Sequence, residues 1–296
     1  DLTTWELSNG IEVILKSTDF KRDEVLMSAW SPGGMNTASP QEWVAAKTAV
    51  AVAGETGMGE FSIVELGKLL AGKRVELSPF LDMDREGLSG RASPEDLETL
   101  FKLIHLRFTT VREDADAFQV LQNRLRESIR NRDSDPKQVF RDIVSATLTN
   151  YHPRLLPMTL EEVEAMDQTA SLNFFAERFS NAGDFTFFLV GNLEADQLEP
   201  LVETWLASLP SVDATEERAS LETGFPRYRL EREITRGVEP VSEVRMVWTS
   251  EDFDWTYASR HAVHSMVAAL RRQLREELRE ERGGTYHVSV YPQLTH

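Results

Sequence analysis

The stretch that decides the fold is WELSNGIEVIL, residues 5–15. Two short apolar runs flank Asn9-Gly10, a pair that favours the backbone conformation of a tight hairpin turn. A third apolar run, VLMSAW over 25–30, comes next and is closed by Pro32-Gly33-Gly34. The sequence therefore predicts three strands near the start of the chain, the first two joined as an antiparallel hairpin.

Helices dominate the residues after this hairpin and third strand. Apolar residues at helical spacing predict helices over about 41–53 and 62–70, and turn-rich apolar runs predict strands over about 74–92. Ser93-Pro94 is a strong helix start, because Ser caps a helix well and Pro fits its first position. The remaining elements expected are a helix carrying Phe118, Leu121, Leu125 and Ile129, helices from Pro136 and over 159–166, 168–179 and 198–208, and a buried strand over 185–192. This order predicts an α+β module, an antiparallel-rich mixed sheet packed with helices.

The opening pattern returns after a polar stretch. Residues 211–222 carry little apolar pattern and are interpreted as a linker. Beyond them, 229–234 and 244–248 resemble two strands around a turn at Arg236-Gly237, and a long helix is expected over about 255–281. The sequence therefore predicts repeated modules. One is complete over 1–210, and the other, truncated, is the N-terminal part of a homologous module over 223–296.

Composition excludes several kinds of function. The formal net charge is −17, so the surface would repel a phosphate backbone, and we expect no nucleic-acid partner. The absence of cysteine removes disulfides, thiolate catalysis and cysteine-bound zinc. No apolar run reaches the roughly 20 residues of a membrane span. The chain begins at Asp1 without a leader, and we interpret it as a piece of a longer protein.

Several phrases, taken in order, resemble the pitrilysin/insulinase family of zinc metallopeptidases. They are LSNGIEV (7–13), SPGG (31–34), LLAGK (69–73), GRASPEDLE (90–98), FTFFLVGN (185–192), LASLP (206–210) and, in the second module, LREELREERGGTY (274–286). That family is built from α+β modules, usually four, arranged in two halves or two subunits. The resemblance implies that this chain comes from the C-terminal half, which does not bind zinc.

The zinc motif of that family, H-x-x-E-H on a helix, is absent. Its two His bind the metal from one face of the helix, and its Glu polarises a water molecule. The motif would fall in the helix after the third strand, where residues 45–57 contain no His. His261 and His264 form the one close pair, but no Glu lies between them and no third ligand is evident. We expect no metal and no cofactor in this chain, with zinc in the missing catalytic half.

The resemblance also implies two residues that contact the substrate. The family's last module presents an Arg near a helix end and a Tyr seven positions later, and Arg279 and Tyr286 match that spacing. A phenol hydroxyl can donate to the oxyanion of peptide hydrolysis, and a guanidinium can orient a substrate carbonyl. Gly283 and Gly284 would let the turn approach a peptide backbone closely. Arg275 and Arg282 compete with Arg279 for this role.

Two functions of this fold remain open from the sequence, and a third interpretation, an unrelated α+β interaction domain, holds only if the repeat and the phrase matches are coincidental. The first is the non-zinc-binding half of a zinc metalloendopeptidase, which helps to enclose and orient peptides and is inactive alone. The second is a non-catalytic binding or assembly subunit of the same fold, like the core subunits of the respiratory bc1 complex. The expected partners are the catalytic half, in the same polypeptide or in a partner subunit, and a peptide substrate. The resemblance favours the bacterial periplasm, and unpaired strand edges in the truncated module predict self-association.

Overall fold

The first three strands confirm the predicted hairpin and its continuation. The computed structural model describes residues 2–212, 214–218, 221, 224–238, 241–250 and 253–294. Strands β1 (Thr3–Glu6) and β2 (Glu12–Ser17) pair antiparallel, with Trp5 opposite Val13. Gly10 takes a φ of 91° in the turn, and its N–H donates to the Leu7 carbonyl at 2.9 Å. A positive φ is the reason that the turn needs glycine there.

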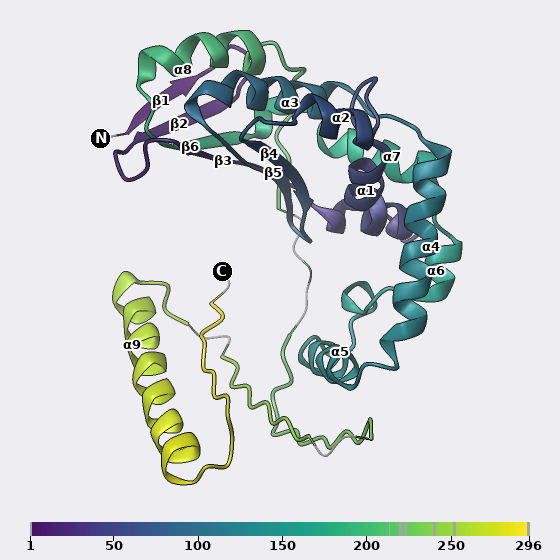
Figure 1. Cartoon of the computed structure of the whole chain (residues 1–296), viewed down its shortest axis with the longest axis vertical. Helices are drawn as coiled ribbons and strands as arrows, with labels where there is room; N and C mark the ends of the chain where they lie inside the picture. The colour runs from purple at the N-terminus through teal and green to yellow at the C-terminus, as the bar shows by residue number, and fades with distance from the viewer. Residues whose placement is uncertain are drawn as a thin grey trace. The chain divides into compact units, whose positions relative to one another are not determined.

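These strands belong to a six-stranded sheet with the order β1-β2-β6-β3-β5-β4 (Figure 1). Its other members are β3 (Val25–Pro32), β4 (Val75–Leu81), β5 (Arg85–Ala92) and β6 (Thr186–Gly191). Among the described strands only the β2–β6 pair is parallel, because β6 returns late in the chain and inserts between β2 and β3. The predicted antiparallel-rich mixed sheet packed with helices, of α+β class, is therefore confirmed.

The helices begin and end close to where the sequence predicts them. Their bounds in the first unit are α1 (Trp43–Thr56), α2 (Ile63–Leu69), α3 (Leu97–Thr109), α4 (Ala115–Arg132), α5 (Pro136–Leu148), α6 (Leu160–Glu164), α7 (Gln168–Arg178) and α8 (Ala195–Leu201). Ser93 accepts a hydrogen bond from Asp96 N, which confirms the predicted cap, although the first turn is a 3-10 turn before α3. A π-helical turn, Val202–Leu206, extends α8.

The core lies between one face of the sheet and the helices on it. Figure 1 shows α3 and α8 along that face of the sheet. Strand β3 alternates accordingly, with Val25, Met27 and Ala29 buried and Leu26 exposed. Five aromatic side chains from α3, α7, β6 and the loop between α7 and β6 make the centre of the core: Phe108, Phe175, Phe179, Phe185 and Phe187. Their packing is what fixes α7 and the loop behind it against the sheet.

The two strands expected after the polar stretch do not form in the described residues. Contacts divide the chain into Asp1–Val238 and Glu239–His296, so the described residues of 211–238 lie with the first unit. No strand is assigned within 229–234 or 244–248, and the two strands expected there are wrong for this structure. Val244, Met246 and Trp248 are largely exposed. An isolated hairpin with no covered apolar face is marginal in water, which explains the missing pairing.

The described residues of the second unit form one long helix and extended chain. Helix α9 (Tyr257–Leu274) continues directly as a π-helical stretch, Arg275–Glu281, which confirms the helix expected near 255–281. The extended residues 286–294 lie along α9, where Arg271 Nε donates to the Val290 carbonyl at 3.0 Å. The homology of this unit to the first module, with its boundary at 223, remains a prediction. Among the described helices, none has the length and apolar character needed to span a membrane.

Candidate functional site

Helix α9 and its π-helical continuation carry the predicted site. Thr256 caps the helix, because its hydroxyl accepts a hydrogen bond from Ser259 N at 3.1 Å. In the last turn, Arg282 N donates to the carbonyl of Glu277, five residues earlier, at 3.2 Å. Wider turns of this kind are rare in helices and recur at functional sites.

Gly283 ends this helix. Its φ of 61° is the left-handed conformation that favours glycine after a helix end, and Gly284 N then donates to the Leu278 carbonyl at 2.9 Å. A Cβ on Gly283 would meet nothing within 4 Å, so the constraint is on the backbone alone. The predicted tight turn at Gly283-Gly284 is therefore present, and its tip is open.

The three competing arginines differ in their ion pairs. Arg282 Nη2 lies 2.6 Å from Glu277 Oε1, and Arg275 Nε lies 3.6 Å from Glu280 Oε1. Within the described residues, Arg279 has no ion pair or hydrogen bond from its side chain, and it is exposed. Its guanidinium is thus available to an outside acceptor, whereas those of the other two are engaged by glutamates of the same helix.

Tyr286 projects from the chain just after the turn. Its side chain is 97% exposed, and its hydroxyl has no partner in the part of the chain that the structure describes. Tyr286 and Arg279 share no hydrogen bond there, so the structure does not bring the two predicted residues into direct contact. The segment behind Tyr286 is held in place, since Arg245 Nη2 donates to Tyr291 Oη at 2.9 Å.

Helix α1 occupies the position where the family resemblance would place the zinc motif. Its buried side carries alanines and the hydroxyl of Thr48, whose Oγ1 lies 2.9 Å from Ser171 Oγ on α7. His261 and His264 of α9 are both exposed, and His261 Nδ1 lies 3.4 Å from Ser265 Oγ. Across the described ranges, no three His, Cys, Asp or Glu side chains are grouped so as to hold a metal ion. The described donor sets therefore do not fit a zinc ion.

A buried charged cluster in the first unit was not predicted as a site. It consists of Glu86 at the start of β5, Arg178 at the end of α7 and Glu216, and we call it the Arg178 cluster. Glu86 is 2% exposed, and its Oε2 accepts a hydrogen bond from Gly34 N at 2.6 Å. Arg178 binds Glu216 through Nη1 at 2.6 Å and Nη2 at 3.1 Å. The sequence signal that marks this place is Pro32-Gly33-Gly34.

Burial controls the charges in the Arg178 cluster. It raises the pKa of Glu86 to about 8, although the Gly34 N–H and the Arg178 guanidinium act in the opposite direction. Burial also raises the pKa of the nearby Asp184 above its ordinary value. For Arg178, burial acts to lower the pKa, but the hydrogen-bonded carboxylate of Glu216 and the charge of Glu86 hold it above its ordinary value. Arg178 therefore stays charged while Glu86 can be neutral near pH 7.

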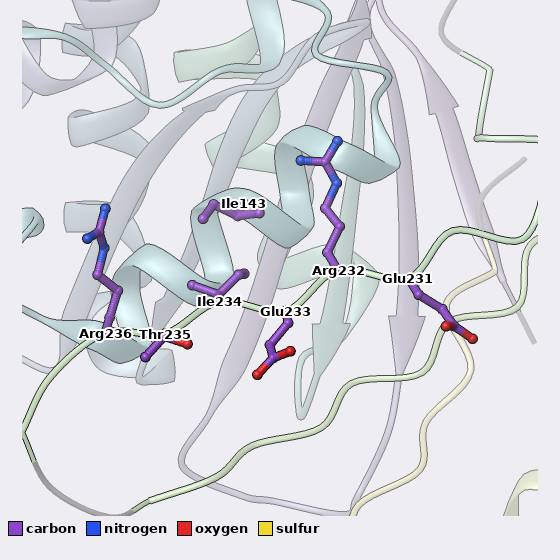
Figure 2. A pocket seen from close by; sticks show the side chains of 7 residues that line it. All are labelled: Ile143, Glu231, Arg232, Glu233, Ile234, Thr235 and Arg236. Atoms are coloured by element: carbon purple, nitrogen blue, oxygen red, sulfur yellow. The ribbon is translucent and has the colours of Figure 1, made fainter.

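A shallow hollow of about 660 Å³ lies between α5 and the residues before Val238 (Figure 2). Its lining residues are Ile143, Glu231, Arg232, Glu233, Ile234, Thr235 and Arg236. Figure 2 shows that the Arg232 and Glu233 side chains point away from each other. Arg232 instead lies over the ring of Tyr151, 5.4 Å from its centroid. Because only Ile143 and Ile234 are apolar and the charged groups do not converge, the hollow lacks the features of a ligand site.

Comparison with known proteins gives a consistent relationship. Residues 167–296 match the family model described as the Peptidase M16 inactive domain. The chain is 26% identical over 300 residues to the probable zinc protease PqqL of Haemophilus influenzae and 28% identical over 299 residues to that of Escherichia coli. Each alignment covers 98% of this chain but 31% of the relative, so the chain spans about a third of these proteins.

Solved structures agree on the fold. The periplasmic protease PqqL of Escherichia coli matches with a TM-score of 0.77 at 23% identity, over 98% of this chain and 32% of that chain. A peptidase M16 inactive domain from Pseudomonas fluorescens matches with a TM-score of 0.58 at 17% identity, over 74% of this chain and 54% of that chain. At these identities the similarity establishes the architecture, and inferences about function rest on the sequence matches.

Proposed function

We propose, from the match of residues 167–296 to the Peptidase M16 inactive domain, that this chain is the non-zinc-binding half of a zinc metalloendopeptidase. In this role it helps to enclose extended peptides and to orient them toward a zinc ion held by H-x-x-E-H in the catalytic half. The observation that carries the proposal is the family match together with alignment over 98% of the chain to relatives named zinc proteases.

Tyr286 is assigned the chemical step in this proposal. The zinc of the catalytic half would supply the activated water. Hydrolysis of a peptide bond places negative charge on the carbonyl oxygen, and a hydrogen-bond donor aimed at that oxygen lowers the barrier. The hydroxyl of Tyr286 is such a donor. Its 97% exposure and its position after a glycine turn support the assignment, because the group is free to reach a peptide bound outside this chain.

Arg279 is assigned the orientation of the substrate. A planar guanidinium can donate two parallel hydrogen bonds to a backbone carbonyl or a carboxylate, which fixes the approach of an extended peptide. Arg275 and Arg282 are each paired with a glutamate of the same helix, whereas Arg279 is unpaired within the described residues. This difference favours Arg279 over its two neighbours.

The alternative function is a non-catalytic binding or assembly subunit of the same fold. It predicts that neither the protein carrying this chain nor its partner subunit contains an intact H-x-x-E-H segment. The description of the relatives as zinc proteases favours the enzyme. Reading the residues that precede this chain in its gene decides between the two.

Substrate and compartment follow from the relatives as further parts of the proposal. One structural neighbour, with a TM-score of 0.61, is a ferredoxin protease solved in complex with Arabidopsis ferredoxin, and another is described as periplasmic. We accordingly propose polypeptide substrates and a periplasmic location. Exposed apolar residues on extended chain, such as Val244 and Trp248, also favour self-association of the isolated piece. Sedimentation across a wide concentration range tests that association.

The deciding experiment compares Tyr286→Phe with the unsubstituted protein that carries both halves. Loss of one oxyanion donor lowers kcat about a hundredfold or more, with a smaller change in KM. The zinc content should stay at one ion per catalytic site, since Tyr286 is not a ligand. Unchanged turnover with zinc in place would show that Tyr286 has no catalytic role. The chain of residues 1–296 alone should cleave no peptide.

A further inference from the structure

The Arg178 cluster holds a segment that the sequence marks as a linker. We define the connecting segment as the described residues among 211–218, which come directly after the first predicted module. We propose that Glu86 and Arg178 form a proton-controlled latch for this segment. With its carboxyl neutral, Glu86 leaves Arg178 to bind Glu216, and the segment stays on the first unit. Loss of the proton from Glu86 releases the segment.

The connecting segment is attached through an ion pair between one buried side chain and one half-exposed side chain. Arg178 belongs to α7, and its side chain is only 4% exposed, whereas that of Glu216 is 41% exposed. Both terminal nitrogens of Arg178 donate to the Glu216 carboxylate, one to each oxygen. This bidentate geometry makes the contact specific for a carboxylate. The α7–β6 loop adds weaker contacts, since Val212 N donates to Asn181 Oδ1 at 2.9 Å and Asn181 Nδ2 donates to the Ala214 carbonyl at 2.8 Å. Glu216 is therefore the charged end of a polar attachment.

Glu86 competes for the same guanidinium. Its Oε1 lies 3.8 Å from Nη1, the nitrogen that binds Glu216 Oε2 at 2.6 Å. The three charged groups converge closely beside Gly33. A Cβ on that glycine would lie 2.6 Å from Glu216 Oε2, 2.8 Å from Glu86 Oε1 and 2.9 Å from Arg178 Nη1. Because Glu86 is fixed on β5 and Glu216 is half exposed, Glu216 is the carboxylate that leaves when both are charged.

The surrounding charges strengthen this competition. Besides Glu86 and Glu216, the acidic groups near Arg178 are Glu177 on α7, at 3.2 Å, and Asp184, whose Oδ2 accepts from Glu216 N at 3.4 Å. The second cation, Arg218, faces Asp84 at 3.7 Å and lies over Trp30 instead of pairing with Glu86. One buried guanidinium thus serves several carboxylates, and ionisation of Glu86 adds a further negative charge at short range. The pKa of about 8 for Glu86 places the release on the alkaline side of neutrality.

The absence of cysteine makes the latch directly measurable, and the test is independent of the proposed peptidase function. Spin labels are placed on Thr215→Cys in the connecting segment and on Ser89→Cys, an exposed site on β5. Pulsed electron-spin resonance at pH 6.5 should give one narrow distance distribution. At pH 9.5 the narrow peak should be lost to a broad distribution, with half of the change near pH 8.

Matched variants separate the latch from general unfolding. Glu86→Gln keeps an acceptor for Gly34 N without a titrating proton, so the distribution should stay narrow at both pH values. Glu216→Gln, on the exposed side, should be broad at both pH values. A second label pair on Ser89→Cys and Glu199→Cys should stay narrow throughout. The proposal is overturned if the distance distribution stays narrow at pH 9.5 in the labelled chain that keeps Glu86 and Glu216, or if it is narrow at pH 6.5 in Glu216→Gln. It is also overturned if the distance distribution of Glu86→Gln changes with pH.

Discussion

Arg178 and Glu216 lie 38 positions apart and are joined by two hydrogen-bonded contacts, Nη1 to Oε2 at 2.6 Å and Nη2 to Oε1 at 3.1 Å. The arginine is buried and the glutamate is not, so this pair differs from a surface ion pair, which contributes little to stability. Removing the glutamate would leave a buried cation without its main partner, which is costly. The pair therefore attaches a polar stretch of chain to a well-packed core.

Glu86→Gln should change how stability depends on pH. Burial raises the pKa of Glu86 from its ordinary 4.5 to about 8, so the folded state holds the proton more tightly than the unfolded state. The stabilisation from this group is fully present below pH 4.5 and is lost as the pH rises to about 8. Within that window the slope is at most about 1.4 kcal/mol per pH unit.

Urea unfolding of the two proteins at pH 5, 6.5, 8 and 9.5 measures this effect. The free energy of unfolding of Glu86→Gln, relative to the unsubstituted chain, should rise between pH 5 and pH 8 and level off above it. A difference that does not vary with pH would show that Glu86 titrates in the folded state near its ordinary value.

Gly34→Ala should destabilise the first unit. Gly34 has a φ of 78°, and a Cβ there would lie 2.5 Å from Arg85 N and 2.6 Å from Asp84 N. Backbone atoms cannot move aside as a flexible side chain can, so we expect a loss of about 3 kcal/mol in the free energy of unfolding. Gly67→Ala is the matched control, because Gly67 lies within α2 with nothing near its Cβ position. That variant should gain up to about 1 kcal/mol, and equal effects of the two would refute the steric explanation.

Gly283→Ala should disturb the predicted site more than Gly284→Ala. Gly283 has a φ of 61°, whereas Gly284 has no positive φ and its Cβ position lies 3.6 Å from the nearest atom, the Leu278 carbonyl oxygen. Forcing alanine into the left-handed conformation costs about 1 kcal/mol or more and favours a different helix end. In the protein with both halves, kcat should fall for Gly283→Ala and change little for Gly284→Ala. The reverse ranking would exclude the turn geometry as the cause.

Arg279→Gln should impair peptide cleavage more than Arg282→Gln. The guanidinium of Arg282 is paired with Glu277 at 2.6 Å, whereas Arg279 is unpaired within the described residues. If Arg279 orients the peptide, kcat/KM should fall about tenfold to a hundredfold, as is typical when a charged hydrogen bond to substrate is lost. Arg279→Lys should remain impaired, because an ammonium cannot reproduce the planar fork. Equal kcat/KM values for Arg279→Gln and Arg282→Gln would show that Arg279 does not orient the peptide.

Local signals explain why the first module could be predicted closely. Asn9-Gly10 and Ser93-Pro94 each allow few backbone conformations, and both appear as predicted. Contacts across long sequence separations carry no such signal. The insertion of β6 between β2 and β3, and the pairing of Glu86 with an arginine on α7, depend on how the chain crosses the sheet. The Arg178 cluster was missed for that reason, although the glycines at 33 and 34 mark it.

In the second unit, a clear strand pattern in the sequence does not form a strand in the structure. Apolar alternation over 244–248 is a good strand pattern, but a strand also needs a partner and a covered face. The structure supplies neither among the described residues, and the pattern stays unpaired. The helical pattern of α9 needs no distant partner for its hydrogen bonds, so the helix forms where the sequence predicts it. For Tyr286 and Arg279, the residues were chosen by their spacing and the family resemblance, and their roles stay predictions.

The alanine-lined side of α1 has a consequence for where a metal could be held. Ala46, Ala49 and Ala53 are each at most 2% exposed, and the hydroxyl pair of Thr48 and Ser171 joins α1 to α7. An imidazole at any of these positions would need space that neighbouring atoms already fill, and overpacking of this kind costs about 1–3 kcal/mol. A metal site could arise on this side of α1 only through several coordinated changes, each destabilising by itself. The zinc that the proposed function requires would therefore have to be held outside this helix.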